Sequence, residues 1–132
     1  MPAGYSGTPL AKKLGLKDGF RVALEGMPDE VFAEIESYGA AIEPAEDDLD
    51  LLHVFTTERA VLEARVKAGR NLIRPDGMIW ASWPKKASKV PTDITEDTIR
   101  EIALPLGLVD VKVCAVNEIW SGLKLVIRKE LR

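Results

Sequence analysis

Two tryptophans and two adjacent lysines are the side chains of this sequence whose types and spacing best suit a ligand site. Trp83 ends the apolar segment 78–83 (MIWASW), and Lys85 and Lys86 follow it after one proline. Trp120 stands at the start of the later sequence WSG. Ammonium groups attract phosphate and carboxylate groups, and an indole ring offers a flat apolar wall. This combination suits a small anionic or nucleotide-like ligand, while a solvated lysine pair and tryptophans packed in the core are the alternative interpretation.

Side chains for nucleophilic or acid–base catalysis are harder to place. The chain has one histidine, His53, which falls inside an apolar segment, and it has no GxSxG motif. Ser82 and Ser121 are therefore expected to have no histidine beside them. Asp93 and Glu96 stand where a helix should begin, and helix capping accounts for both. The sequence predicts no catalytic set.

Metal binding is not expected either. A structural zinc site needs about four histidine or cysteine ligands, and the chain has one of each, His53 and Cys114. The acidic segment 43–50 lacks the alternating acids and the glycine of a calcium loop. Cys114, within VKVCAV, is expected to be a small buried core residue.

The composition limits the class of protein. The chain has 132 residues, a net charge of -3 at pH 7 and an isoelectric point near 5.3, which gives no general attraction to nucleic acid or anionic membranes. No apolar run approaches the roughly 18 residues of a membrane span, and the N-terminal sequence lacks the apolar core of a signal peptide. We therefore expect one cytoplasmic domain covering residues 1–132, with no nucleic-acid or membrane partner.

Strand-like and helix-like segments alternate along the chain. The expected helices are 9–14, 28–39, 57–72 and 95–105, and the expected strands are 20–25, 40–43, 49–57, 78–83, 109–120 and 122–129. Thr56 or Thr57 is expected to cap the third helix, and RPDG, residues 74–77, to form a turn. The last two strands are so close in sequence that Ser121 and Gly122 are expected to join them as an antiparallel hairpin.

Alternating strands and helices predict a parallel sheet with helices on both faces, to which the final hairpin is the exception. Ligands of such sheets bind outside the carboxyl ends of the strands. The residues expected at this edge are Glu25, Gly26, Thr56, Trp83, Lys85, Lys86, Trp120 and Ser121. Free amide groups at the start of the helix after Thr56 would add to the attraction for an anion.

The order of segments resembles that of class I methyltransferases. LGLKDGFRVALEG, residues 14–26, is similar to the start of such a domain, and LIRPDGMIWASWP, residues 72–84, is similar to its LKPGG turn and following strand. The resemblance implies a three-layer α/β/α fold with a mostly parallel six-stranded sheet of order 2-1-3-4-6-5, numbered along this chain. It also implies that the last strand is antiparallel and that one strand–helix unit is missing.

A narrower resemblance covers IWASWPKK, residues 79–86, and WSGLKLV, residues 120–126. Both segments resemble those of a family of short bacterial proteins known as domain of unknown function 3052. That resemblance implies no established activity.

The methyltransferase resemblance implies S-adenosylmethionine as a cofactor, held by a glycine-rich loop after the first strand. Here that loop has one glycine, Gly26, followed by Met27 and Pro28, which disfavours the cofactor. Glu43 would take the ribose hydroxyls if the cofactor bound.

Three functions stay open at this point. The first is a non-catalytic domain that binds a small anionic ligand at the carboxyl edge of the sheet. The second is an S-adenosylmethionine-dependent methyltransferase with an atypical cofactor loop. The third is an interaction module that forms a homodimer through its exposed final hairpin, in which residues 109–116 (VDVKVCAV) would be an unprotected edge strand.

Overall fold

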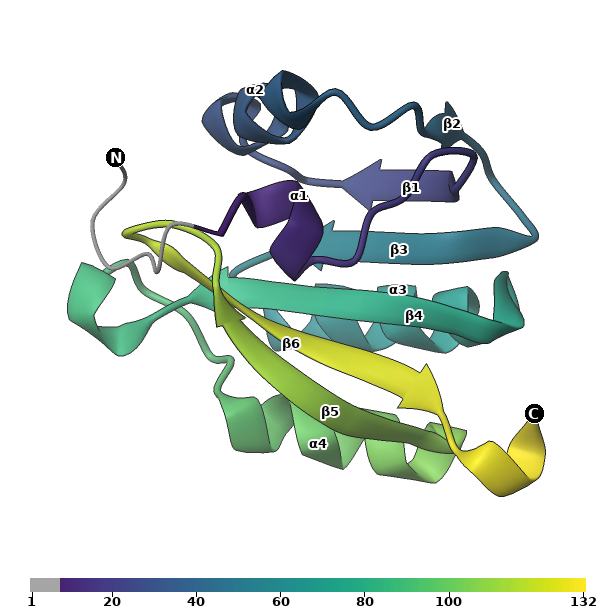
Figure 1. Cartoon of the computed structure of the whole chain (residues 1–132). Helices are drawn as coiled ribbons and strands as arrows, with labels where there is room; N and C mark the ends of the chain where they lie inside the picture. Colours follow the sequence, from purple (N-terminus) through teal and green to yellow (C-terminus); the bar gives the residue numbers. More distant parts are fainter. Residues whose placement is uncertain (1–7) are drawn as a thin grey trace.

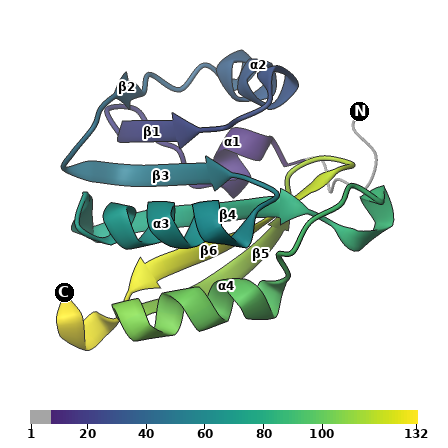
Figure 2. The same ribbon diagram turned by 180° about the vertical axis from the view of Figure 1, so that it is seen from behind.

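The computed structural model describes residues 8–132, which form a six-stranded sheet with helices on both faces (Figure 1 and Figure 2). The helices are α1 (Leu10–Lys13), α2 (Asp29–Tyr38), α3 (Arg59–Arg70) and α4 (Glu96–Ala103). The strands are β1 (Arg21–Glu25), β2 (Glu43–Pro44), β3 (Leu49–Phe55), β4 (Ile73–Pro84), β5 (Leu108–Ala115) and β6 (Trp120–Ile127). Short 3-10 turns occupy Lys86–Ser88, Leu104–Leu106 and Lys129–Leu131. Within residues 8–132 no helix is long and apolar enough to cross a membrane.

The strand order is β2-β1-β3-β4-β6-β5, as predicted. β1 is parallel to β2 and to β3, and β3 is parallel to β4. β6 is antiparallel to both of its neighbours, β4 and β5. The last strand of the sequence therefore lies between two strands that precede it. The predicted α/β class, sheet order and antiparallel last strand are all confirmed.

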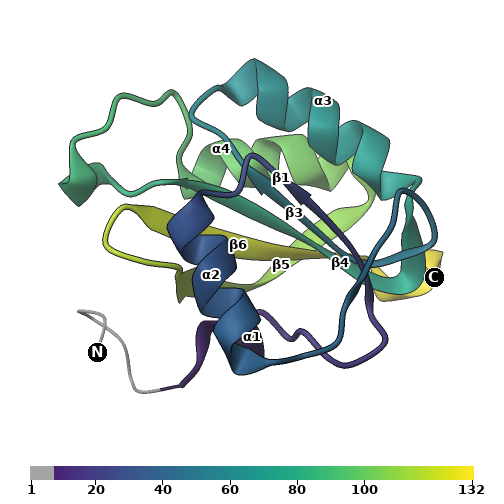
Figure 3. The ribbon, with the colours of Figure 1, turned by 90° about the horizontal axis from the view of Figure 1, so that it is seen from above.

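Side chains from alternate positions of the central strands fill two cores. In β3, Leu52 and Val54 pack in the core against α3 and α4, while Leu51 and Phe55 pack in the core against α1 and α2. Figure 3 shows these two helical layers on opposite sides of the sheet. The nearly continuous apolar sequence of β3 follows from burial of both of its faces.

Trp80, fully buried in β4, joins the sheet to α1. Its Nε1 donates a hydrogen bond of 2.9 Å to the carbonyl oxygen of Leu14, just after α1. A buried indole N–H needs such a partner. On the neighbouring strand β6, a Cβ added to Gly122 would lie 3.2 Å from the Trp80 ring, so a glycine there leaves room for the tryptophan.

The predicted position of the hairpin turn is wrong. Ser121 and Gly122 lie within β6, and the chain turns earlier, at residues 116–119. The side-chain oxygen of Asn117 accepts hydrogen bonds from the N–H groups of Ile119 (2.9 Å) and Trp120 (2.8 Å). An asparagine that bonds backbone groups two or three residues further on stabilises a turn, and this local signal outweighs the Ser-Gly pair.

Two features predicted beside the strands also differ. The strand expected at 40–43 is reduced to the two residues of β2, because β2 pairs with β1 only at Arg21 and Val22. The turn expected at 74–77 is an irregularity inside β4, where the pairing with β3 shifts between Leu49 and Leu51. A bulge absorbs extra residues without ending a strand, which the Pro-Asp-Gly composition alone does not reveal.

Gly26, directly after β1, provides a test of how closely β1 and β3 approach. Its φ is +69°, and a Cβ there would clash with the carbonyl oxygen of Phe55. We expect Gly26→Ala to lower the free energy of unfolding, measured by urea denaturation, by about 3 kcal/mol. The left-handed conformation accounts for about 1–2 kcal/mol and the clash for the rest.

The matched control is Gly39→Ala. Gly39 has a φ of +86° and nothing within 4 Å of an added Cβ, so this change should cost only the conformational part. Equal losses from the two variants would show that the contact with Phe55 is unimportant.

Candidate functional site

The residues after β4 border a hollow at the carboxyl edge of the sheet, which we call the edge hollow. Its volume is about 800 Å³, and its walls include Trp83, Lys85, Lys86 and Ser121, four of the residues predicted for the site. Trp83 and Ser121 lie opposite each other in the β4–β6 ladder, so their side chains face the same side of the sheet. The start of α4 forms the other wall.

The loop that carries the lysines is held at both ends. The N–H of Lys85 donates to the carbonyl oxygen of Ile119 at 2.8 Å, and Ser88 Oγ donates to the carbonyl of Lys85 at 2.7 Å. At the far end, Thr92 Oγ1 donates to the carbonyl of Thr57 at 2.7 Å. The loop is therefore fixed against both the β5–β6 turn and the segment after β3.

Three lysines give the edge hollow its positive charge. Lys85 is half-buried, and Lys86 and Lys89 are exposed. None of the three forms an ion pair with another residue of the described range 8–132. Sequence reasoning missed Lys89, although its spacing from Lys86 across one short turn could have indicated it.

The acids on the facing wall are held by Arg100, which was also not predicted. Its guanidinium contacts Glu96 at 2.8 Å, Asp97 at 3.0 Å and Asp110 at 3.1 Å. Hydrogen bonds to these carboxylates, with Asp110 first, raise the pKa of Arg100. Arg100 carries one positive charge against three carboxylates and offsets them only in part, so an anion would be attracted by the three lysines of the loop on the opposite wall.

Trp120 does not share the edge hollow with Trp83. Pro84 pairs with Trp120, and Trp83 pairs with Ser121, so the two tryptophans point to opposite faces of the sheet. Trp83 is only 7% exposed and belongs to the core beneath α3 and α4. The Trp120 ring meets Phe55 edge-on at 5.3 Å, on the α1 and α2 side. The expected wall of two tryptophans is therefore not formed.

Glu25, at the end of β1, is engaged by a partner. Both of its carboxylate oxygens accept hydrogen bonds of 2.7 Å from Arg65 of α3, and this pairing raises the pKa of the arginine. A bidentate pair fixes both side chains. Glu25 is thus directed toward α3.

Thr56 lies where the sequence predicts it, but it does not cap α3. Its Oγ1 accepts from the N–H of Glu58 at 3.2 Å, and α3 begins only at Arg59. The N–H of Arg59 donates to Asp93 Oδ1 at 2.6 Å. The start of α3, expected to attract an anion, is therefore already occupied by an aspartate from the loop before α4. Thr95 caps α4, in a reciprocal pair with Thr98.

A buried histidine–serine contact contradicts the expectation that no histidine lies beside Ser82. His53 Nε2 is 2.6 Å from Ser82 Oγ, and both residues are 0% exposed. His53 also stacks on Phe55 at 4.3 Å, and its Nδ1 has no partner among the described residues. Sequence reasoning missed the contact because it requires the β3–β4 register, which pairs Phe55 with Ser82.

This contact cannot serve an external substrate. Burial lowers the pKa of His53 to about 3, so the ring is neutral at ordinary pH, and neither residue reaches solvent. Cys114 is buried as predicted, and burial raises the pKa of its thiol. No group of three or more histidine, cysteine, aspartate or glutamate residues within 8–132 could hold a metal ion.

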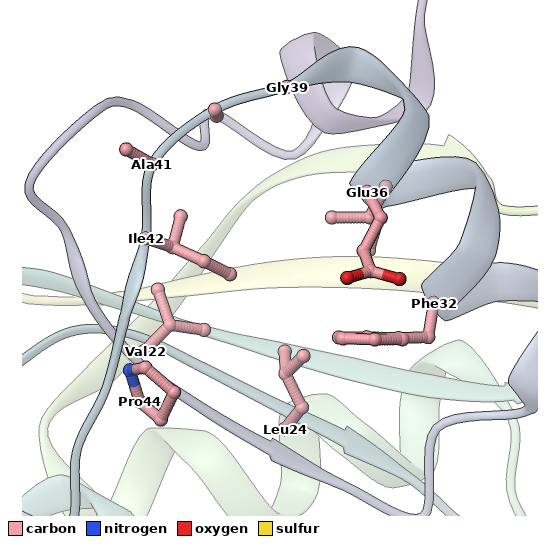
Figure 4. Close-up of a pocket in the computed structure, with 10 residues that line it drawn as sticks. Val22, Leu24, Phe32, Glu36, Gly39, Ala41, Ile42 and Pro44 are labelled. Carbon is pink, nitrogen blue, oxygen red and sulfur yellow. The ribbon is translucent and has the colours of Figure 1, made fainter.

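A second hollow lies between α2 and the start of β2, and we call it the α2 hollow (Figure 4). Its volume is about 540 Å³, and Figure 4 shows Val22, Leu24, Phe32 and Ile42 around it, with the carboxylate of Glu36 beside them. Sequence reasoning missed this hollow. Phe32, which lines the hollow, is 40% exposed.

Solved structures with a similar fold include SAM-dependent methyltransferases. A SAM-dependent methyltransferase from Aquifex aeolicus matches with a TM-score of 0.61 and 14% identity, over 89% of this chain and 88% of that chain. A TehB-like SAM-dependent methyltransferase from Corynebacterium glutamicum matches with a TM-score of 0.55 and 11% identity, over 96% and 91%. Fibrillarin from Aeropyrum pernix, with natively bound S-adenosyl-L-methionine, matches with a TM-score of 0.54 and 13% identity, over 93% and 70%.

The chain thus has a class I methyltransferase-like fold. No family model matches it, and no curated protein matches it. The narrower resemblance to domain of unknown function 3052 stays a prediction.

The residues of this chain do not fit S-adenosylmethionine. The single glycine after β1, Gly26, is accounted for by the close approach of Phe55, and Glu25 is bound to Arg65. In the sheet, Glu43 of β2 lies beside Arg21 at the start of β1. Arg21 precedes Gly26 by five positions, which is a distance of roughly 16 Å along a strand. The acid that would take the ribose therefore lies away from the carboxyl edge, and no methyl-transfer step follows from this geometry.

His53 makes a specific pH dependence testable. Its folded pKa, about 3, lies below the ordinary value of 6.5, so the unfolded chain takes up the proton first as the pH falls. Stability is full above pH 6.5 and should decrease toward pH 3, by up to about 1.4 kcal/mol per unit. Urea denaturation between pH 7 and pH 5, where few carboxylates titrate, measures this.

The control is His53→Gln, which removes the one histidine of the chain. This variant should be less stable at pH 7 but should show little pH dependence between pH 7 and pH 5. A wild-type protein with no slope in that interval would contradict the buried neutral histidine.

Proposed function

We propose that this chain is a binding domain that holds a small phosphate-bearing anion in the edge hollow and catalyses no reaction on it. The observation that carries the proposal is the set of three lysines, Lys85, Lys86 and Lys89, which border one hollow and have no acidic partner in the described structure. Ammonium groups on a fixed loop attract phosphate strongly.

The geometry supports a phosphate group more than a stacked base. Trp83 is almost completely buried, and Trp120 lies on the other face of the sheet, so no exposed indole face borders the lysines. The position of the hollow at the carboxyl edge agrees with the general location of ligand sites in such sheets.

We propose that the edge hollow is not catalytic because the side chains that line it do not form a catalytic set. Ser121 is the hydroxyl residue of β6 in the edge hollow, and the histidine of the chain is buried against Ser82 instead. The acids in the hollow, Glu96 and Asp97, are paired with Arg100. A methyltransferase with an atypical loop is the alternative, and it rests on fold similarity alone.

We further propose that residues 1–132 act as one cytoplasmic domain. We also propose that the chain belongs with the short bacterial proteins of domain of unknown function 3052, on the resemblance of residues 79–86 and 120–126. Neither proposal bears on the chemistry of the edge hollow.

Thermal denaturation with orthophosphate, pyrophosphate, ATP and S-adenosylmethionine tests the ligand class. A ligand at about 100 times its dissociation constant adds about 2.7 kcal/mol to stability, so a true ligand should raise the melting temperature clearly. We expect stabilisation by a phosphate compound, and at least about tenfold weaker binding in a Lys85→Gln and Lys86→Gln double variant, because each charged hydrogen bond contributes about 1.5–3 kcal/mol.

Lys67→Gln on the exposed side of α3 is the matched control and should bind as the wild type does. Stabilisation by none of the four compounds would overturn the proposal. Stabilisation by S-adenosylmethionine alone would favour the methyltransferase alternative.

A homodimer through β5 is the second candidate. Among the described strands β5 pairs with β6 alone, and its side chains Val111 and Val113 are 54% and 49% exposed. An open edge strand with exposed valines favours pairing with another strand. We propose that two copies pair along β5 in a symmetric dimer.

Light scattering over a range of concentrations tests the dimer. Val111→Lys should shift the protein to a monomer, because a charged side chain on an edge strand opposes pairing. Val61→Lys, at an exposed valine of α3, should leave the mass unchanged. A wild-type protein that is monomeric at all concentrations would exclude this candidate.

A further inference from the structure

The other edge of the sheet is left open along half of β1. β3 pairs with β1 from Val22 to Glu25, but β2 pairs with it only at Arg21 and Val22. After that the chain leaves β1 and turns through residues 46–48 to reach β3. Within residues 8–132, no strand pairs with the second half of β1 on this side.

The hydrogen bonds that hold β2 show which backbone groups are left open. The N–H of Glu43 donates to the carbonyl of Phe20 at 2.7 Å, and the N–H of Ala45 donates to the carbonyl of Val22 at 3.0 Å. Peptide groups of alternate residues in a strand point to the same side. The carbonyls of Phe20 and Val22 face β2, and Leu24 follows Val22 at the same spacing of two residues. The N–H and carbonyl of Leu24 therefore face the same side of β1, where the edge is open.

Two hollows lie on either side of this open edge. On the α2 side is the α2 hollow, in which Leu24 and Val22 form the floor and Phe32 of α2 forms a wall (Figure 4). On the α3 side is a hollow of about 750 Å³ between Glu25 and the loop residues Glu46 and Asp47, which we call the acidic hollow. An added strand would therefore find an apolar space for one face and an acidic space for the other.

The charges on this edge are not all balanced by neighbours. Asp47 pairs with Arg21 at 3.1 Å, and Glu25 pairs with Arg65. Glu46, which lines the acidic hollow, forms no ion pair with any residue in the described part of the chain. A partner segment with basic side chains on that face would complement this free carboxylate.

We propose that the open half of β1 binds an extended peptide segment of another protein, in which apolar and basic residues alternate. The peptide adds a strand beside β1, bonded to the N–H and carbonyl of Leu24. Successive side chains of a strand point to opposite faces. Its apolar side chains therefore enter the α2 hollow, and its basic side chains reach Glu46 in the acidic hollow. This site is separate from the edge hollow and does not depend on the function proposed there.

The test uses a capped synthetic peptide, acetyl-Lys-Leu-Lys-Leu-Lys-amide, and ¹⁵N-labelled protein studied by NMR. We expect the Leu24 amide to exchange with solvent at least about tenfold more slowly at saturating peptide, because its N–H gains a partner. The same peptide N-methylated at every residue keeps its side chains but cannot donate backbone hydrogen bonds, and it should not bind. A peptide with glutamate in place of each lysine should also not bind.

Two charge-reversal variants of the protein complete the test. Glu46→Lys should weaken binding of the lysine peptide about tenfold, since it replaces an attraction by a repulsion. Glu63→Lys, at an exposed glutamate of α3, changes the net charge equally and should have no effect.

Unchanged exchange of the Leu24 amide, or equal binding of the N-methylated peptide, would overturn the proposal. If the Leu24 amide is instead protected in the protein alone, and more so at higher protein concentration, a second copy of this chain occupies the edge and the proposed foreign peptide is wrong.

Discussion

The buried Trp80 is the interaction on which the core between the sheet, α1 and α2 depends. Its ring is fully enclosed on that face of the sheet, and its one polar atom is bonded to Leu14 beside α1. α1 is a helix of four residues, too short to be stable by itself. The indole hydrogen bond and the apolar contacts of Leu10 and Leu14 in the same core hold it in place. The ring also constrains its neighbour, because a Cβ added at position 122 would lie only 3.2 Å from it and 3.1 Å from Ser82 Oγ.

The ion pairs show which charged side chains hold the structure together and which are left free to bind a ligand. Every ion pair found among residues 8–132 uses an arginine, and the largest cluster gathers Glu96, Asp97 and Asp110 around Arg100. Arginine forms a rigid fork suited to carboxylates, whereas a lysine carries a compact charge on a flexible stem. In this protein the arginines hold the loops and helices, and the lysines of the edge hollow stay available to a ligand.

Much of the fold could be predicted because its causes are local in the sequence. The helix from Pro28 to Gly39 has a proline and acids at its start and a glycine at its end, and the structure places α2 between them. The continuous apolar run of β3 indicated burial on both faces, and that is also confirmed. The turn of the last hairpin was misplaced because Asn117 competes with the Ser-Gly pair, and composition does not rank the two signals.

The candidate site was harder to predict, since it depends on register. Trp83 and Trp120 do lie at the same edge of the sheet. Because Trp120 is opposite Pro84 in the ladder, the two tryptophan side chains point to opposite faces. The contact of His53 with Ser82 and the pairing of Glu25 with Arg65 likewise join residues 29 and 40 positions apart. Such contacts follow from how strands and helices align, and no single segment contains that information.

The position of β6 also has a consequence for how the chain is made. β4 is buried along most of its length and has β3 on one side and β6 on the other, yet β6 comes after β5 in the sequence. During synthesis, β4 therefore keeps an unpaired apolar edge until residues 120–127 have left the ribosome. Exposed strand edges of incomplete chains are prone to aggregation. A truncated product that lacks β6 should need a chaperone more than the complete chain does, because its missing strand belongs in the centre of the sheet.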